Sequence, residues 1–194
     1  MRIVGGKWRS RTIEAPEGRG TRPSVDRTRE AMASMILSAF DLDLSEVVML
    51  DAFAGSGAVG FEMLSRGAKS CTFIEKSRRV ADIVRKNAKA LGADEGSVHV
   101  QTGDALALAS RGAIIGGPFD LVFLDPPYAM EAKVVTQMVQ DLCGHEALKE
   151  GALVLYEHAT SSSGLMLEEA TMIRKKKQGI STYELMRLDS GLTT

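Results

Sequence analysis

Residues 47–60 read Val-Val-Met-Leu-Asp-Ala-Phe-Ala-Gly-Ser-Gly-Ala-Val-Gly, an apolar run that ends at Asp51 and leads into three closely spaced glycines. The run has the length and composition of a buried strand, and a segment with helical character follows it up to Arg66. A glycine-rich turn between a strand and a helix lets the backbone approach a ligand, while the helix N-terminus offers N–H groups and partial positive charge. The stretch therefore predicts the first strand–loop–helix unit of a nucleotide-binding α/β fold.

The same alternation continues along the chain. Before the glycine loop, Asp26 is expected to cap a helix whose apolar residues recur at helical spacing. Near the C-terminus, residues 165–176 and 181–188 flank Gln178-Gly179 and are expected to form a closing hairpin. Short apolar strands that alternate with helices predict a doubly wound, mostly parallel α/β sheet covered on both faces. The further strands are predicted at 71–74, 98–100, 120–124 and 153–156, and the further helices at 78–91 and 132–143.

Composition narrows the classes of protein to which the chain can belong. The chain has 44% hydrophobic and 25% charged residues, which is ordinary for a globular domain. We expect no membrane span and no signal peptide, because no apolar run approaches eighteen residues and the N-terminus has no apolar core. Cys71 and Cys143 lack metal-ligand spacing, and His99, His145 and His158 form no ligand pattern. These features predict a cytoplasmic protein without a metal. We also expect the protein to be a monomer.

Charge is distributed unevenly, although the formal net charge of the whole chain is only −1. Residues 1–29 hold eight basic and three acidic residues, so the remainder of the chain carries a net charge of −6. We interpret residues 1–25 as a basic arm or hairpin that meets a polyanion, and residues 26–194 as the globular domain. A solvated surface segment is the simpler alternative. The candidate phosphate contacts are Lys7, Arg9, Arg11 and Arg22.

A carboxylate follows the glycine loop at an informative spacing. Glu75 lies 20 residues after Gly55 and ends the second predicted strand, where it can accept hydrogen bonds from both hydroxyls of a ribose. This pattern predicts a cofactor that contains adenosine, and it leaves both NAD and S-adenosylmethionine open. The predicted cofactor site comprises Asp51, Ala54, Gly55, Ser56, Gly57, Glu75, Lys76, Asp104 and Ala105.

Two carboxylates in that site have structural alternatives. Asp51, at the end of the first strand, can orient the amino group of a methionine moiety, directly or through water, or can stabilise the local turn. Asp104, after the third strand, can bind the adenine amino group or serve as a helix N-cap. The sequence leaves both choices open.

The tetrapeptide Asp125-Pro-Pro-Tyr128 ends the fourth strand. In a doubly wound sheet the first and fourth strands are neighbours, so this motif and the glycine loop open into one crevice. Pro126 and Pro127 remove two N–H donors and stiffen the backbone, so the motif presents a carboxylate and a carbonyl beside an aromatic ring. This set of acceptors suits an amino group on a flat heterocycle, and a nicotinamide enzyme has no use for it.

The motif also suggests a reaction. Hydrogen bonds from both N–H groups of an exocyclic base amine to Asp125 and the Pro126 carbonyl would turn its lone pair toward an activated methyl group. Tyr128 can stack on the base, which has to be unpaired or flipped out to enter. Holding the reacting groups in line would supply much of the acceleration. The predicted catalytic residues are Asp125, Pro126, Pro127 and Tyr128.

At this point the sequence resembles a known family, the RsmD-type guanine-N2 methyltransferases of small-subunit rRNA. The cofactor motifs are shared across the wider class of Rossmann-like methyltransferases, whereas the N-terminal pieces point to this family. The matching pieces are Arg2-Ile-Val-Gly-Gly6, Thr21-Arg-Pro23, Asp26-Arg27, Arg29-Glu-Ala31, Asp51-Ala-Phe-Ala-Gly-Ser-Gly-Ala58, Leu64-Ser-Arg-Gly-Ala68, Phe73-Ile-Glu-Lys76 and Leu124-Asp-Pro-Pro-Tyr128.

The resemblance implies a seven-stranded sheet whose last strand enters antiparallel. It also implies S-adenosylmethionine as methyl donor and the N2 of a guanine in 16S rRNA, or in the assembling small subunit, as acceptor. The substrate would be bound partly through the N-terminal segment. Two other functions remain open from the residues alone, an adenine-N6 methyltransferase of DNA or RNA and an NAD-dependent oxidoreductase.

Overall fold

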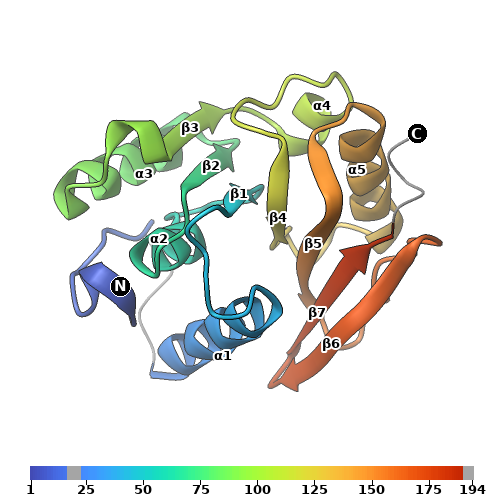
Figure 1. Cartoon of the computed structure of the whole chain (residues 1–194), viewed down its shortest axis with the longest axis horizontal. Helices are drawn as coiled ribbons and strands as arrows, with labels where there is room; N and C mark the ends of the chain where they lie inside the picture. Colours follow the sequence, from blue (N-terminus) through green and yellow to red (C-terminus); the bar gives the residue numbers. More distant parts are fainter. Residues whose placement is uncertain (17–22, 190–194) are drawn as a thin grey trace.

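The protein is described here by a computed structural model that covers residues 1–16 and 23–189. Its centre is a seven-stranded sheet with the strand order β3-β2-β1-β4-β5-β7-β6 (Figure 1). Strands β1 to β5 are parallel neighbours, and β7 pairs antiparallel with both β5 and β6. The strands are β1 (Val48–Asp51), β2 (Ser70–Glu75), β3 (Val98–Thr102), β4 (Phe119–Leu124), β5 (Leu148–Ala159), β6 (Ala170–Gln178) and β7 (Ser181–Leu188).

Helices cover both faces of the sheet, as the alternating pattern predicts. One core cluster joins α1, α2 and α3 to the face that carries Met49, Phe73 and Phe123. A second cluster joins α4 and α5 to the opposite face, which carries Leu50, Val122 and other apolar residues. The helices are α1 (Pro23–Ala39), α2 (Ala58–Ser65), α3 (Arg78–Leu91), α4 (Ala105–Ala109) and α5 (Ala132–Gly144), with short 3-10 turns η1 (Gly6–Trp8) and η2 (Glu95–Ser97).

The predicted fold class is confirmed. Among the strands of residues 1–16 and 23–189, only the last one, β7, runs against the others, and it lies between β5 and β6 (Figure 1). The closing hairpin forms with its turn at Gly179, but its first strand begins at Ala170 rather than at residue 165. Leu165 and Leu167 are buried in the cluster around α5, so these apolar residues belong to an irregular segment that packs on the core and not to a strand.

One predicted cap is wrong. Helix α1 begins at Pro23, so Asp26 lies in its first turn and is not the N-cap. A proline is well suited to the first turn of a helix, because its fixed φ is helical and its missing N–H would have no intrahelical partner. The Asp26 carboxylate instead accepts hydrogen bonds from Arg2 Nε, at 2.8 Å, and from Arg29 Nη2.

Residues 1–16 pack against the body of the protein as a hairpin-like loop. Ile3 and Ile13 are fully buried, and an antiparallel bridge joins Arg2 to Thr12. The Trp8 ring is buried and meets the edge of Phe61 in α2, with ring centroids 6.4 Å apart. The segment is therefore part of the hydrophobic core at its base, and only some of its side chains reach the surface.

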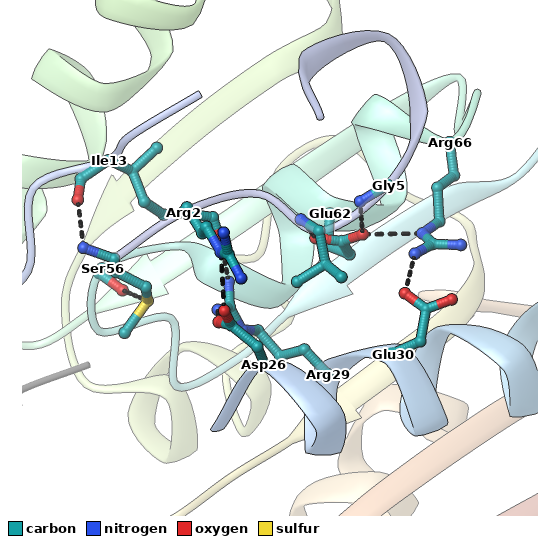
Figure 2. A network of polar contacts seen from close by, with 11 residues as sticks. Arg2, Gly5, Ile13, Asp26, Arg29, Glu30, Ser56, Glu62 and Arg66 are labelled. Atoms are coloured by element: carbon teal, nitrogen blue, oxygen red, sulfur yellow. Dashed lines mark hydrogen bonds and ion pairs between the residues drawn. The ribbon is translucent and has the colours of Figure 1, made fainter. Parts of the chain in front are cut away.

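A buried carboxylate anchors that segment (Figure 2). Glu62 in α2 is 1% exposed and accepts hydrogen bonds from the backbone N–H groups of Val4 and Gly5, each at 2.8 Å. Arg66 donates to the same carboxylate at 2.8 Å and also reaches Glu30 in α1 at 2.6 Å. Because a buried charge is tolerated only when it is paired and hydrogen-bonded, these donors explain why a glutamate can occupy this place.

Among residues 1–16 and 23–189, no helix combines the length and apolar character that crossing a bilayer requires.

Candidate active site

The carboxyl ends of β1, β2, β3 and β4 lie at one edge of the sheet, because these four strands are parallel and adjacent. Each of these strands ends with, or is closely followed by, an acidic residue that the sequence analysis proposed as a site residue. Asp51 ends β1, Glu75 ends β2, Asp104 follows β3 by two residues and Asp125 follows β4 directly. The predicted cofactor and catalytic residues therefore come together at one edge, and β1 pairs with β4 as the switch point requires.

The glycine loop connects β1 to α2. Gly55 and Gly57 have φ values of 53° and 78°, which are in the region that favours glycine. Gly60 serves a different purpose, since a Cβ there would lie 2.3 Å from the Phe73 ring. Two glycines thus shape the turn and the third lets α2 lie close to β2. Ala54 and Ser56, the other predicted loop residues, are both buried.

Asp51 is 1% exposed and has one unsatisfied oxygen. Its Oδ2 accepts a hydrogen bond from Gly60 N at 3.2 Å, while its Oδ1 meets no donor among the described residues. Burial, together with the nearby charge of Glu75, raises the pKa of Asp51 to about 7, and the bond from Gly60 opposes this shift. A buried acceptor without a partner is costly, so this place favours a proton or a cationic donor next to Oδ1.

Glu75 holds the glycine loop in place. Its Oε2 accepts from Gly55 N at 3.1 Å, and its Oε1 accepts from Ser77 N at 2.8 Å. A carboxylate offers about four lone-pair sites, so these two bonds leave capacity for further donors. The ribose contact of Glu75 stays a prediction, and the structure shows a further role for this carboxylate, that of shaping the loop.

Asp104 adopts the structural alternative. Its Oδ1 accepts from the backbone N–H groups of Leu106, at 3.1 Å, and Ala107, at 3.4 Å, so it caps α4. Its Oδ2 pairs with Lys76 Nζ at 2.7 Å, and this hydrogen bond lowers the pKa of Asp104. This ion pair joins the loops after β2 and β3, so the two predicted cofactor residues Lys76 and Asp104 lie in contact. Ala105, the first residue of α4, is buried.

The tetrapeptide after β4 is half buried. The Asp125 side chain is partly covered, Pro126 is buried, and Tyr128 is 50% exposed. The Pro127 carbonyl accepts from Met130 N at 2.8 Å, which closes the turn. The tetrapeptide thus carries a partly covered acidic group and a half-exposed aromatic ring on a backbone whose two prolines keep it rigid.

Strand β7 supports the tetrapeptide from the side. The Tyr128 hydroxyl and Ser181 Oγ lie 2.9 Å apart in a hydrogen bond. Tyr183 donates its hydroxyl proton to Glu157 Oε1, also at 2.9 Å. Burial, then the charge of Glu157 and its hydrogen bond, and finally the charge of Asp125 raise the pKa of Tyr183, so it stays a phenol. The tetrapeptide is therefore bordered by a cluster of β5 and β7 side chains.

Sequence reasoning missed this cluster, which comprises Ser181, Tyr183 and Glu157. One signal was available for Glu157, since it directly follows the predicted strand 153–156 and ends up at the same edge as Asp125. The two β7 residues had no comparable local signal. Their position depends on the insertion of β7 beside β5, which pairs Tyr183 with Glu157.

The basic candidates near the N-terminus differ from one another. Lys7 and Arg9 are exposed, and the Lys7 ammonium lies 4.6 Å from the centre of the Trp8 ring. The Arg11 guanidinium donates to the carbonyls of Leu91, at 3.0 Å, and Ala90 at the end of α3. Arg11 therefore has a structural role in addition to any contact with a ligand. Arg22 lies outside the described residues.

In the part of the chain that the structure describes, no group of three or more His, Cys, Asp or Glu side chains has the arrangement of a metal site.

Known proteins are similar to this chain in both sequence and fold. The family described as "Conserved hypothetical protein 95" matches residues 1–187. The Haemophilus influenzae protein named "Ribosomal RNA small subunit methyltransferase D" is 33% identical over 186 residues, which are 95% of this chain and 92% of that protein. The Escherichia coli K12 protein of the same name is 33% identical over 193 residues, which are 98% of this chain and 91% of that protein.

A solved structure is also similar to this chain in its fold. The structure described as "Putative methyltransferase yhhF from Escherichia coli" superposes with a TM-score of 0.79 at 31% sequence identity. The match covers 97% of this chain and 98% of the other, so it includes the N-terminal segment and the β6–β7 hairpin as well as the central sheet.

Proposed function

Since the chain belongs to the family of the small-subunit ribosomal RNA methyltransferases D, we propose that it methylates the exocyclic N2 of a guanine in 16S rRNA with S-adenosylmethionine as donor. The observation that carries this proposal is the position of Asp125-Pro-Pro-Tyr128. The motif ends β4, which pairs with β1, and β1 leads into the glycine loop. A site for an amine thus adjoins a site for an adenosine-containing cofactor.

The residues around the glycine loop fit the cofactor. Glu75 would accept hydrogen bonds from the ribose, and the unpaired Oδ1 of Asp51 calls for a cationic donor such as the ammonium of a methionine moiety. Asp104 keeps acceptor capacity for an adenine amino group, and Lys76 and Ala105 would border that place. When bound, S-adenosylmethionine supplies a methyl group made electrophilic by the positively charged sulfur.

The tetrapeptide would prepare the acceptor. An exocyclic base amine is a poor nucleophile, because its lone pair is conjugated into the ring. The Asp125 carboxylate and the Pro126 carbonyl would accept its two hydrogens and so turn the lone pair out of the ring plane. Tyr128, with its ring half exposed, would stack on the flipped base. After transfer the surplus proton would go to Asp125 or to water.

The preference for guanine rests on the family. The tetrapeptide alone would serve the N6 of adenine equally well, and the glycine loop with Glu75 alone would serve NAD. The N-terminal pieces shared with the RsmD-type proteins include Arg2-Ile-Val-Gly-Gly6, and this piece is held against α2 by Glu62. The match over residues 1–187 includes these pieces.

The N-terminal segment would hold the RNA. Lys7 and Arg9 are exposed on a segment that is fixed to the core, which suits contacts that position a phosphate backbone without selecting bases. Arg11 and Arg22 belong to the same proposal, although the helix carbonyls already engage Arg11. We place the protein in the cytoplasm as a monomer that acts on rRNA or on the assembling small subunit.

The test is nucleoside mass spectrometry of 16S rRNA from a strain that lacks this protein. We expect one N2-methylguanosine to disappear and to return when the wild-type gene, but not an Asp125→Ala variant, is supplied. Loss of a methyladenosine instead would support the adenine-N6 alternative. Titration of the purified protein with S-adenosylmethionine and with NAD tests the oxidoreductase alternative. We expect S-adenosylmethionine to bind and NAD not to bind, and the reverse result would favour the oxidoreductase.

A further inference from the structure

A row of three polar side chains begins at the catalytic tetrapeptide and crosses the sheet toward β7. The last pair in the register of β4 and β5 is Leu124 with Tyr156, and continuing this register by one residue brings Asp125 beside Glu157. Glu157 pairs in turn with Tyr183 in β7. Neighbouring strands are about 4.8 Å apart, and paired residues point to the same face. Asp125, Glu157 and Tyr183 therefore form one row on one face of the sheet.

Contacts within the row agree with this arrangement. Tyr183 is 3% exposed and donates to Glu157 Oε1 at 2.9 Å. The charges of both Glu157 and Asp125 act on the Tyr183 phenol and keep it protonated by raising its pKa, after the larger effect of burial. The hydroxyl is thus a permanent donor, and it fixes the orientation of the Glu157 carboxylate.

The far end of the tetrapeptide is tied to the same strand. The Tyr128 hydroxyl is hydrogen-bonded to Ser181 Oγ, two residues before Tyr183. Tyr128, which would stack on the base, therefore contacts β7, whereas Asp125, which would bind the amine, lies at the end of β4 beside β5. Because β5 lies between β4 and β7, a base bound by Asp125 and Tyr128 would have its ring edge near the C-terminal part of β5, which carries Glu157.

We propose that Glu157 is a specificity-determining residue that accepts the N1–H of the target guanine. This inference rests on the proposed function and extends it. In guanine N2 and in adenine N6 alike, the amine stands beside ring atom N1. That atom carries a hydrogen in guanine and a lone pair in adenine, so a carboxylate next to it attracts the first base and repels the second. A site that hydrogen-bonds one partner discriminates strongly against an analogue that leaves its buried polar group unpaired.

The capacity of the carboxylate is sufficient for this role. A carboxylate accepts at about four lone-pair sites, so the bond from Tyr183 does not exhaust Glu157. Tyr183 acts on the base only through Glu157, and it is therefore a positioning residue. The tetrapeptide supplies the acceptors for the amine, and the β5–β7 pair supplies the distinction between the two purines.

The discriminating variant is Glu157→Gln. It keeps the shape of the side chain and retains an oxygen for the Tyr183 hydroxyl, but this bond would turn the amide NH2 toward the base. The test compares guanosine with 2-aminopurine riboside, which keeps the 2-amino group and has an unprotonated N1. Each nucleoside is placed at the mapped target position of a synthetic RNA, which is reconstituted into small subunits if free RNA is not methylated.

The wild-type enzyme should prefer guanosine in kcat/KM, and Glu157→Gln should reduce that preference by about ten- to a hundredfold, the effect of one hydrogen bond to a charged group. The Kd for S-adenosylmethionine should not change. In the double variant Glu157→Gln/Tyr183→Phe the amide can turn its oxygen toward N1, so part of the preference for guanosine should return. Glu150→Gln, an exposed position at the other end of β5, is the matched control.

The outcomes separate this inference from the proposed function. An unchanged guanosine-to-2-aminopurine ratio in Glu157→Gln, with N2-methylguanosine still the product, would refute the role of Glu157 and leave the function intact. A product other than N2-methylguanosine from the wild-type enzyme would refute the function itself. A uniform fall in rate for both nucleosides, or a fall in melting temperature alone, would show Glu157 to be structural and would also overturn the inference.

Discussion

The carboxyl edge of the sheet has two halves that are built in different ways. In the cofactor half, the carboxylates at the ends of β1, β2 and β3 accept backbone N–H groups that lie at most 20 residues away, such as Gly60 for Asp51 and Gly55 for Glu75. In the base half, the polar groups meet each other across strands. Tyr128 contacts Ser181, 53 residues away, and Tyr183 contacts Glu157, 26 residues away.

This difference has a consequence for function. Each contact among the proposed cofactor-binding residues forms within a strand–loop–helix unit or between adjacent units, so the cofactor half is complete once β1, β2 and β3 are paired. The base half exists only when β7 has entered the sheet beside β5. Changes in one half should therefore leave the other largely unaffected, because sites that share no partners usually behave additively.

The largest expected effect tests this independence in the base half. Asp125→Ala removes the acceptor for the amine, so methyl transfer should fall by roughly 10²–10⁴-fold, the range for loss of a positioned acid–base or electrostatic group. The Kd for S-adenosylmethionine, measured by calorimetry, should stay at the wild-type value. Wild-type turnover would overturn the mechanism, and loss of cofactor binding would move Asp125 into the cofactor half.

The next effect concerns the pH dependence of stability in the cofactor half. The pKa of Asp51 is raised from 3.8 to about 7 in the folded state. Between pH 3.8 and pH 7 the folded protein therefore keeps a proton on Asp51 that the unfolded chain has lost, so the free energy of unfolding falls as the pH rises through this range. At 1.36 kcal/mol for each pH unit, wild type should lose about 2–3 kcal/mol from this group between pH 5 and pH 8.

Asp51→Asn should abolish that part of the decline, as urea unfolding at the two pH values would show. The same measurement on Glu95→Gln, an exposed position in η2, provides the control. S-adenosylmethionine should in addition bind wild type more tightly at pH 8 than at pH 6, because a cationic donor favours the ionised carboxylate. If the Asp51→Asn variant lost as much stability as wild type between pH 5 and pH 8, the Asp51 carboxylate would not titrate in this range.

A smaller effect should follow from Glu75→Ala. Loss of hydrogen bonds to a charged acceptor costs about 1.5–3 kcal/mol, or roughly ten- to a hundredfold in cofactor affinity. Since Glu75 also holds Gly55 N, Glu75→Gln, which keeps an acceptor for this bond, should recover part of the affinity. Methyl transfer at saturating cofactor should change little. An unchanged Kd in both variants would remove Glu75 from the ribose site.

The smallest effect lies outside both halves. Replacing Lys7 and Arg9 with alanine should weaken RNA binding at low salt and flatten the dependence of log K on log salt by about one to two units. Binding of S-adenosylmethionine should be unaffected. The simpler alternative, a segment that only packs on the body, predicts an unchanged slope, and a lower melting temperature with intact RNA affinity would favour it. Lys149→Ala, on a lysine paired with Asp120, serves as a comparison for loss of a basic residue.

The sequence allowed much of the fold and of the cofactor half to be predicted. Apolar runs that end in Asp51, Glu75 or Asp125 mark the strand ends directly, and α/β alternation then places those ends at one edge. Asp26 was misjudged because a proline three residues earlier begins the helix. Glu62 carried no signal as an anchor of the N-terminal segment, because its partners at Val4 and Gly5 are almost sixty residues away.

By itself, the sequence determined the order of the strands and helices, the glycine loop and the tetrapeptide, because each of these depends on residues within a few positions of one another. Only the tertiary structure decided that Glu157, Ser181 and Tyr183 would surround the tetrapeptide. The register of β7 against β5 is set by which apolar side chains reach the core on each face, and no local pattern encodes it. The same holds for the raised pKa of Asp51, since burial arises only when α2 and the sheet close around it.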